Sequence, residues 1–559
     1  MLRIANCSGF YGDRLSAARE MVEGGPIDVL TGDWLAELTM LILAGNRLKG
    51  RPGYAPTFLR QLEDVLGTCL ERGIRIVSNA GGLDPAGCAD AVRELAGRLG
   101  LSPRVAHVSG DDLTGRELDL VNADTGERLT AAPLTANAYL GGRPIAAALA
   151  AGADVVVTGR VTDAALVTGP GIWRYGWTPD DLDPLAGSVV AGHVIECGCQ
   201  ATGGNYAFFQ DVPDLAHCGF PIAELHADGS SVITKHPGTG GLVSVGTVTA
   251  QLLYEIAGPC YPGPDVVARF DTISLAPDGP DRVRISGVRG EPPPDTLKVA
   301  VNYLAGYRNT MTLVLTGLDI EEKARVAEEA IWARVPKDSF DEVDVTLTEH
   351  GLLRITVMDA DRERAGRAFS SAVVETGLAN YPGFYGLTPP GPASPYGVYW
   401  PVLVPASEVR PEVYVDGERI PLDLDAPRGQ PVADVPAEPE TGPQGEPAVR
   451  MPLGRIAGAR SGDKGGNANL GVWTTSPERY AWLDAYLTTE RLKSLLPELA
   501  PYRVDRHPLP NLNAVNFVVH GLLGRGVAAS PRMDPQAKAL GEELRARPVE
   551  VPARLVQTV

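Results

Sequence analysis

The stretch GADVVVTGRVTDAALV, residues 152–167, carries the pattern that decides the fold: a β-branched apolar run, a Thr-Gly turn and the start of a helix. The same order recurs in RIANCSG (3–9), IDVLTG (27–32), IRIVSNAGG (74–82) and HVSG (107–110). Between these runs lie segments such as 84–99, where Ala, Val and Leu recur at three- and four-residue spacing. Alternating strands and helices predict an α/β domain with a mainly parallel sheet.

The rest of the chain divides by composition and pattern. Residues 1–290 form the α/β domain with antiparallel additions. Residues 291–422 contain the order strand, helix, strand, strand, helix, which is typical of a ferredoxin-like α+β unit. Residues 423–451 are rich in Pro, Glu, Gly and Ala and predict an extended linker. Residues 452–559 are expected to form a second ferredoxin-like α+β domain, which the linker lets reach the first domain of its own chain or of a neighbour.

Composition excludes several classes of protein. The chain has 559 residues and a net charge of −19, which repels nucleic acid and anionic lipid. No run of about 18 apolar residues is present, and the N-terminus lacks the pattern of a secretory signal. The seven cysteines are odd in number and scattered, so we expect a reduced, cytoplasmic protein without a disulfide framework.

Candidate catalytic residues lie where the strands end, because open α/β sheets bind ligands outside the carboxyl ends of their strands. Here we expect Asp111, Asp112, Arg160 and Asp163 to converge, with Arg160 binding a substrate carboxylate through a bidentate pair. The alternative is that each acid caps the next helix. Mg²⁺ or Mn²⁺ could bridge such carboxylates, but the expected site contains no metal.

A denser group lies in AGHVIECGCQATGGN, residues 191–205. His193 and Glu196 are three residues apart, and a carboxylate beside an imidazole suits general acid/base chemistry because it raises the imidazole pKa. A structural histidine is the alternative. Cys197 and Cys199 have neither the spacing nor the further ligands of a metal site.

Substrate-binding positions are expected around Gly-rich turns, where backbone N–H groups can receive an anion. The expected positions in the N-terminal domain are Asp33, Asn79, Gly81, Gly82, Gly203, Gly204, Lys235, Gly240 and Gly241. The segment GLVSVGTV (241–248) has the glycines of a P-loop but Thr247 in place of the lysine, and no dinucleotide fingerprint follows the first strand. We therefore expect no cofactor.

The C-terminal segment RSGDKGGNAN, residues 460–469, carries more polar groups than a hairpin turn needs. A solvated loop is one interpretation. The other is that the loop covers the first domain's cleft, so that Lys464 acts on an anionic substrate and glycines allow a close approach. The substrate-binding residues expected in this segment are Arg460, Ser461, Asp463 and Asn467.

Several separated segments resemble the acyclic terpene utilisation (AtuA) family: residues 152–167, GHVIECGCQATGGNY (192–206), KHPGTGGLVSVGTVTAQLLYEI (235–256) and ARSGDKGGNANLGVW (459–473). The resemblance covers essentially the whole chain. It implies a role in the degradation of citronellol- and geraniol-type compounds through branched acyl-CoA intermediates, and a ferredoxin-like C-terminal domain. It carries over no catalytic residues.

The sequence thus favours an enzyme that acts on a small carboxylic acid or acyl-CoA by hydration, dehydration or carbon–carbon cleavage. The competing hypothesis is a non-catalytic acyl-CoA-binding or assembly subunit of a catabolic complex. In either case we expect a homo-oligomer, with no nucleic-acid or membrane partner.

Overall fold

The large N-terminal sheet has the parallel core that the repeated turns predict. The computed structural model describes residues 1–424, 428–430, 433–439 and 447–556. The core strands run in the order β1 (Leu2–Asn6), β2 (Val29–Gly32), β3 (Arg75–Ser78), β6 (Val155–Thr158) and β4 (Val105–Ser109), all parallel. Their Ser/Thr-Gly turns therefore meet at one edge, as the sequence predicts.

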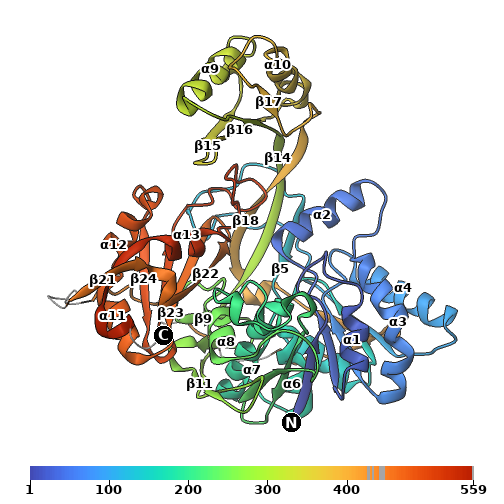
Figure 1. Cartoon of the computed structure of the whole chain (residues 1–559). Helices are drawn as coiled ribbons and strands as arrows, with labels where there is room; N and C mark the ends of the chain where they lie inside the picture. Colours follow the sequence, from blue (N-terminus) through green and yellow to red (C-terminus); the bar gives the residue numbers. More distant parts are fainter. Residues whose placement is uncertain (425–427, 431–432, 440–446, 557–559) are drawn as a thin grey trace.

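Antiparallel strands extend this sheet at both sides. Beyond β1 come β7 (Pro221–Leu225), β8 (Ser231–Lys235), β12 (Arg282–Ser286) and β11 (Ser274–Pro277), and beyond β4 come β19 (Glu412–Val415) and β20 (Glu418–Ile420). One face is covered by α1 (Ala17–Glu23), α3 (Pro56–Arg72) and α4 (Pro85–Arg98). The other is covered by α5 (Arg143–Ala150), α6 (Ala165–Tyr175) and α7 (Leu182–Ile195) (Figure 1). The strands are buried on both faces because each face packs on helices, as in other parallel sheets.

A single long strand, β14 (Thr296–Val314), links this body to an upper lobe (Figure 1). Its first part pairs with β5 (Thr135–Ala138) and β18 (Ser394–Pro405) in the body. Its second part pairs with β16 (Leu352–Asp359) and β17 (Tyr385–Gly386), and β16 pairs with β15 (Glu342–Leu347). The helices α9 (Ile320–Trp332) and α10 (Phe369–Glu375) cover this sheet.

The lobe has the sheet order β15-β16-β14-β17, which is the split βαβ arrangement expected from the pattern. The range 291–422 extends beyond the lobe. Because β14 and β18 are long enough to cross from lobe to body, and β19 and β20 join the main sheet, both ends of that range belong to the body.

The C-terminal unit is a four-stranded antiparallel sheet in the order β22 (Ala457–Lys464), β23 (Asn467–Thr474), β25 (Ala514–Val519) and β24 (Val504–Leu509). Its outer face packs on α11 (Pro477–Tyr486), α12 (Thr489–Leu495) and α13 (Leu540–Ala546). A separate ribbon pairs β21 (Ala448–Pro452) with β26 (Pro548–Pro552), followed by α14 (Ala553–Val556).

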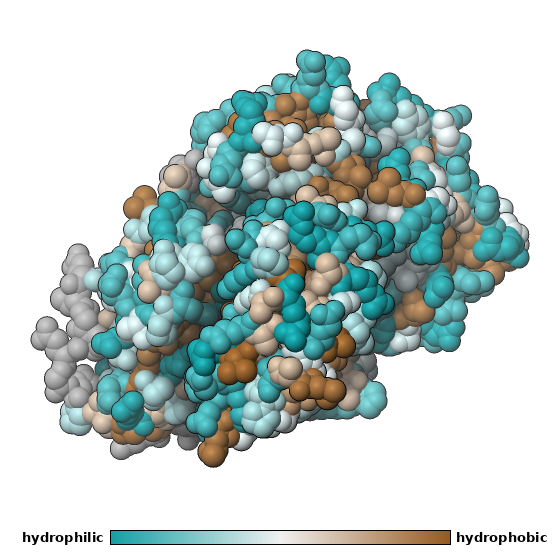
Figure 2. Space-filling view, turned by 90° about the horizontal axis from the view of Figure 1, so that it is seen from above, coloured by the Kyte–Doolittle hydropathy of each residue, from teal (hydrophilic) through white to brown (hydrophobic). Residues whose placement is uncertain are grey.

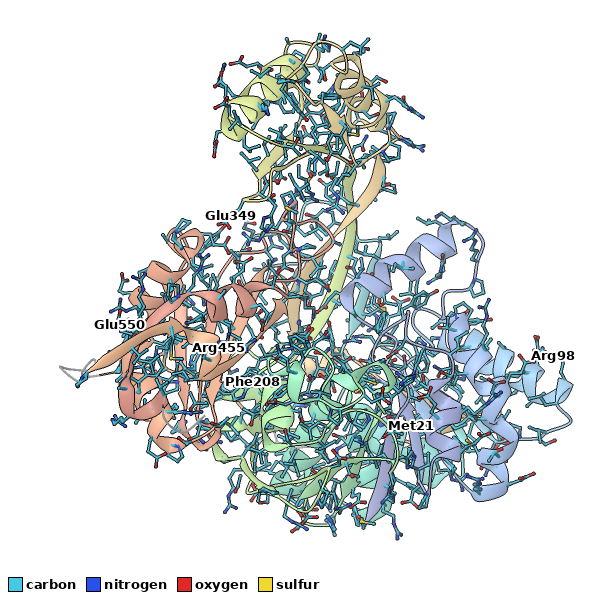
Figure 3. The ribbon with its side chains drawn as sticks, in the orientation of Figure 1. Met21, Arg98, Phe208, Glu349, Arg455 and Glu550 are labelled. Carbon is cyan, nitrogen blue, oxygen red and sulfur yellow. The ribbon has the colours of Figure 1, made fainter. Side chains whose placement is uncertain are left out.

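The inner face of this sheet docks on the body around α8 (Val245–Leu252). A Cβ on Gly471 would lie 2.5 Å from the Leu253 side chain, so the glycine permits the close approach. Asn469 accepts a hydrogen bond from the Glu255 backbone N–H at 2.8 Å and donates to the Leu253 carbonyl at 2.8 Å. Phe208, at the junction in Figure 3, lies 5.1 Å below the Arg545 guanidinium. The C-terminal domain therefore docks on its own chain.

The described parts of the Pro-rich linker form no helix or long strand but are attached to the body and the C-terminal domain. Asp434 accepts a hydrogen bond from the Cys260 backbone N–H at 2.8 Å, and Ala437 exchanges backbone and side-chain hydrogen bonds with Arg506. A small sheet of β9 (Cys260–Pro262), β10 (Val267–Arg269) and β13 (Arg289–Glu291) lies beside this segment.

The visible surface is mainly hydrophilic, with apolar side chains in scattered patches rather than one continuous area (Figure 2). In the part of the chain that the structure describes, no helix combines the length and the apolar character needed to cross a membrane.

Candidate functional site

The site begins where β2 and β3 end. Asn79 donates its side-chain amide to the Asp33 carboxylate and accepts a hydrogen bond from the Trp34 backbone N–H at 2.8 Å. Asp33 also accepts from the Leu35 backbone N–H at 3.0 Å. Burial and the nearby Asp163 raise the pKa of Asp33 well above its usual range. Asp33 and Asn79 thus bind each other and nearby backbone N–H groups, which holds the ends of β2 and β3 in place.

Arg160 follows β6 and is only 4% exposed. One guanidinium nitrogen lies 2.9 Å from Asp163, another donates to the Leu35 carbonyl at 2.5 Å, and the Tyr139 ring lies 4.4 Å below the guanidinium carbon. These contacts occupy the fork that was expected to bind a substrate carboxylate. Arg160 instead fixes Asp163 at the edge of the sheet.

His193 and Glu196 lie in and just after the last turn of α7, three residues apart, with 3.2 Å between His193 Nδ1 and Glu196 Oε1. Burial, together with the Lys464 charge, lowers the pKa of His193 to about 4. Burial and Asp163 raise the pKa of Glu196 well above its usual range. The expectation that Glu196 raises the imidazole pKa is therefore wrong: loss of solvent outweighs the pairing, so the imidazole is neutral at neutral pH and the Glu196 carboxyl holds its proton more tightly than a solvated glutamate does.

Lys464 enters the same space from the C-terminal domain. Its ammonium lies 5.5 Å from the centre of the Tyr261 ring. Burial and the Lys298 charge lower its pKa, while Glu255, Glu37 and Glu196 oppose that shift. A lysine from the end of β22 thus lies among carboxylates from the first domain, the arrangement expected if the hairpin covers the strand ends.

We call this space the recess. It is lined by residues from α2 (Glu37–Leu48), β9, β14 and β22, and from the segments that follow β6, α7 and α8. The residues of the recess are Glu37, Asp163, Glu196, Glu255, Tyr261, Lys298, Asp463 and Lys464. Except for Glu196, each keeps some accessible surface although protein surrounds it. The recess therefore holds several carboxylates around two lysines, partly shielded from bulk water.

A small cavity of about 30 Å³ marks one side of the recess. It is lined by Glu37, Leu41, Tyr399 and Asp463, with Val527 and Gln536 opposite. Burial and Glu37 raise the pKa of Asp463 to about 7. Asp463, which the sequence predicts as a substrate-binding residue, thus lines this cavity together with Glu37. In the described residues, no group of three or more His, Cys, Asp and Glu side chains is placed to share a metal ion.

The four residues expected to converge at the strand ends do so only in part. Arg160 and Asp163 form an ion pair. Asp111 is buried beside them, but it accepts hydrogen bonds from the Arg160 backbone N–H and the Asn137 amide, both at 2.9 Å. Asp112 is exposed and accepts a hydrogen bond from the Thr114 backbone N–H at 2.9 Å. Convergence is therefore wrong for Asp112, because neighbouring side chains in an extended segment point in opposite directions.

The anion site expected at Gly81 and Gly82 is occupied by the protein itself. Asp84 caps α4 by accepting a hydrogen bond from the Gly87 backbone N–H at 2.9 Å, so the helix N-terminus already has its negative charge. A Cβ on Gly81 would lie 2.5 Å from the Thr158 carbonyl oxygen. These glycines allow strand ends to pack closely.

The second Gly-rich group is also structural. Lys235 donates to the Thr239 carbonyl at 2.8 Å and lies 3.2 Å from Asp281, at the far side of the sheet. A Cβ on Gly241 would lie 2.5 Å from the Thr202 carbonyl oxygen, and one on Gly240 2.2 Å from the Asp214 carbonyl oxygen. Gly203 and Gly204 pack in the same way, against Val212 and Cys199. The contacts of these five residues are with their own loops and with Asp281, away from the recess.

Most polar residues of RSGDKGGNAN belong to strands rather than to a loop: β22 continues through Lys464, and the turn is Gly465-Gly466. The Arg460 guanidinium carbon lies 4.3 Å from the Tyr254 ring. Ser461 accepts a hydrogen bond from the Gly541 backbone N–H, and Asn467 accepts one from the Gly521 backbone N–H, both at 2.9 Å. Ser461 and Asn467 therefore hold the hairpin within its own domain.

Sequence reasoning missed several residues of the recess. Lys298 comes from the body end of β14, Tyr261 from β9, and Glu255 from the turn after α8, where its φ of 56° is left-handed. Glu255 lies in the segment 235–256 that resembles the family, but no chemical motif marks Lys298, Tyr261 or Glu255 as site residues. Only the left-handed backbone at Glu255 is unusual, and it is visible only in the structure.

Comparisons with known proteins agree with this architecture. The family described as "Acyclic terpene utilisation family protein AtuA" matches residues 2–415, and the "AtuA ferredoxin-like domain" matches residues 451–550. No curated protein and no solved structure matches the chain. The two matches cover both the body with its lobe and the C-terminal domain, so the chain belongs to the acyclic terpene utilisation (AtuA) family.

Proposed function

We propose that the protein is a cytoplasmic catabolic enzyme whose substrate is a branched or acyclic terpenoid carboxylic acid, free or as its acyl-CoA ester. The reaction is acid/base chemistry: hydration, dehydration or carbon–carbon cleavage. Family membership supports the catabolic role. The recess supports the type of chemistry, because it brings proton donors, proton acceptors and cations together out of bulk solvent.

The observation that carries the proposal is the opposite behaviour of two glutamates around Lys464. Although burial acts to raise it, Lys298 and Arg160 hold the pKa of Glu37 below its usual value. Burial and Asp163 raise the pKa of Glu196 well above its usual value. Relative to a solvated glutamate, Glu37 therefore favours the ionised form that accepts a proton, while Glu196 favours the protonated form that donates one.

The lysines of the recess suit an anionic or polarised oxygen of the substrate. Lys298 and Lys464 would stabilise negative charge that develops on a carboxylate or thioester oxygen when a proton leaves the adjacent carbon. His193, a neutral imidazole 3.2 Å from Glu196, would position the Glu196 carboxyl that donates the proton. Arg160 acts as a positioning residue because Asp163 and the Leu35 carbonyl engage its guanidinium.

The test is turnover of a panel of branched enoyl-CoA esters, 3-hydroxyacyl-CoA esters and the free acids, followed by mass spectrometry. With any substrate found, Glu37→Gln should remove the acidic limb of the kcat/KM profile, and Glu196→Gln the alkaline limb. Glu478→Gln, on the surface of α11, is the matched control and should keep the full profile.

No turnover across the panel, with acyl-CoA binding retained, would contradict the proposal. That result would favour a non-catalytic acyl-CoA-binding or assembly subunit. The upper lobe, which stands apart from the body in Figure 1 and exposes Leu378 and Leu387, is the surface that such a role would use.

A further inference from the structure

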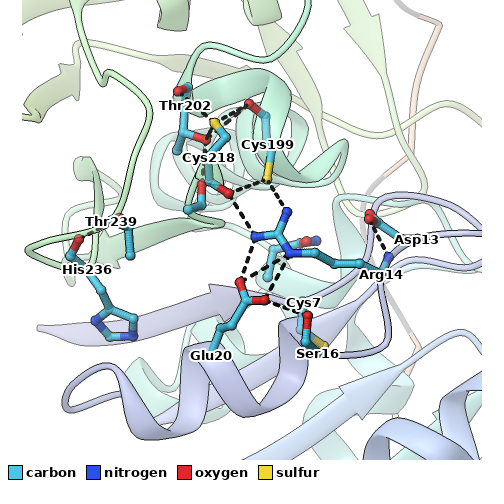
Figure 4. A network of polar contacts seen from close by, with 12 residues as sticks. Cys7, Asp13, Arg14, Ser16, Glu20, Cys199, Thr202, Cys218, His236 and Thr239 are labelled. Carbon is cyan, nitrogen blue, oxygen red and sulfur yellow. Dashed lines mark hydrogen bonds and ion pairs between the residues drawn. The ribbon is translucent and has the colours of Figure 1, made fainter. Parts of the chain in front are cut away.

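Two cysteines outside the recess form a thiol pair beside an arginine (Figure 4). Cys199 lies in the 3-10 helix η1 (Gly198–Thr202) that follows α7, and Cys218 lies just before β7. Cys199 Sγ donates to the Cys218 carbonyl at 3.3 Å, and Cys218 Sγ lies 3.8 Å from the Cys199 carbonyl. The two residues are 19 positions apart in sequence, so only the fold places them together.

The surroundings of the pair favour a thiolate. Arg14 donates to Cys199 Sγ at 3.6 Å and to the Cys218 carbonyl at 2.8 Å. The Thr202 hydroxyl lies 3.1 Å from Cys218 Sγ. A cation and a hydroxyl group next to sulfur stabilise its negative charge. The adjacent Cys199 side chain, whose own pKa is raised, lowers the pKa of Cys218 to about 6 although burial opposes the shift.

The remaining cysteines lack this environment. Burial raises the pKa of the Cys7, Cys69 and Cys88 thiols. Burial raises the pKa of Cys197 and of Cys260 as well, to about 11 for Cys260. Cys199 keeps part of its surface exposed, whereas Cys218 is 5% exposed, so a small oxidant can reach the pair from the Cys199 side.

We propose that Cys199 and Cys218 form a site of reversible oxidation, at which a peroxide converts the two thiols into a disulfide. The Cys218 thiolate attacks one peroxide oxygen; an S–O bond forms, the O–O bond breaks, and the departing hydroxide takes up a proton to leave as water. The Cys199 thiol then attacks the sulfenic sulfur; the S–S bond forms, the S–O bond breaks, and a second water leaves with the remaining proton. Two thiols are oxidised and one peroxide is reduced to two waters.

The disulfide would connect η1 to the chain that enters β7. Since η1 continues directly from α7, this link would restrain the end of α7 that carries Glu196. Closing a loop between the two positions restricts the unfolded chain, so the oxidised protein should melt at a higher temperature. Reduction should reverse the change.

The experiment treats the full-length protein with hydrogen peroxide at one to ten equivalents, blocks free thiols, and digests without reduction. Chymotrypsin is suitable because Phe208 and Phe209 lie between the two cysteines, whereas trypsin has no site between Arg174 and Lys235. A linked Cys199–Cys218 peptide that disappears after dithiothreitol is the expected result, together with a rise in melting temperature of the oxidised protein.

Variants make the assignment specific. Cys197→Ser and Cys260→Ser should still form the link, and Cys199→Ser should leave a sulfenic acid at Cys218 that dimedone traps. Arg14→Gln should slow oxidation several-fold, whereas Arg19→Gln, at a surface ion-pair residue of α1, should not. A Cys197–Cys199 link, or oxidation of Cys260 before the pair, would overturn the proposal.

Discussion

Two buried glutamates in this protein have opposite surroundings. Glu224, on β7, has a 3% exposed side chain and forms ion pairs with Arg3 and with Arg282, the latter at 2.6 Å. Glu196, at the recess, is 8% exposed; among the described residues its Oε2 has no hydrogen-bond partner, and its Oε1 lies 3.2 Å from Nδ1 of the neutral His193. A buried charge that is fully paired stabilises a fold, whereas a buried carboxyl without a partner keeps its proton available. The sheet edge around Glu224 is therefore structural, and the recess is where chemistry is expected.

The largest effect should come from removing the lysine of the recess. Lys464→Ala takes away the charge that faces Glu37, Glu196 and Glu255, so we expect activity in the turnover assay to fall about 100-fold or more. The melting temperature should change little, because the carboxyl groups left without the Lys464 charge can take up protons. A variant with full activity would remove Lys464 from the site.

Removing the Glu224 carboxylate at the sheet edge should have the opposite result, with a loss of stability and no loss of activity. Glu224→Gln leaves Arg3 without its counter-charge and Arg282 with Asp278 as its remaining carboxylate partner. Since the two arginines are 21% and 33% exposed, we expect a loss of about 2 to 3 kcal/mol in the free energy of unfolding. Activity of the folded variant should be retained. Urea unfolding gives the value, with Glu322→Gln, from the exposed pair with Arg325, as a control that should not change it. A Glu224 variant as stable as the wild type would contradict the structural role of Glu224.

Asp111 should show a smaller, pH-dependent effect. Burial raises its pKa to about 6, above the value of about 3.9 expected in the unfolded chain. Between these pH values the folded protein binds the proton more tightly, so Asp111 makes the free energy of unfolding fall as pH rises from about 4 to about 6, by roughly 2 kcal/mol.

In Asp111→Asn this contribution should be absent. The variant should therefore compare more favourably with the wild type at pH 7 than at pH 4.5, as measured by urea unfolding at both values. A constant difference between the two proteins would show that Asp111 does not change its charge over this range.

The smallest effect should come from Asp112→Asn. The side chain is exposed and only caps a short turn at Thr114, so stability should change by less than about 0.5 kcal/mol and activity should stay within twofold. Kinetics and thermal melting test this. A strong loss of activity would show that Asp112 belongs to the recess in solution.

Much of the architecture follows from local sequence. The β-branched runs that end in Ser-Gly or Thr-Gly predict the parallel strands, since the period and the turn residues are local properties. The strand and helix order after Gly306 likewise predicts the upper lobe. The hairpin at Gly465-Gly466 and the pair His193 and Glu196, three apart on one helix face, could also be anticipated.

Only the tertiary structure decides which polar residues share a site. Asp111 and Asp112 are neighbours in sequence, yet one is buried beside Arg160 and the other faces solvent, because strand geometry separates adjacent side chains. Lys298, Glu255 and Lys464 are far apart in the chain and meet only because β14 crosses the body and the C-terminal sheet docks on α8. The pKa directions of His193 and Glu196 also depend on this packing: sequence supplies the groups, but burial by distant segments determines which of them holds the proton.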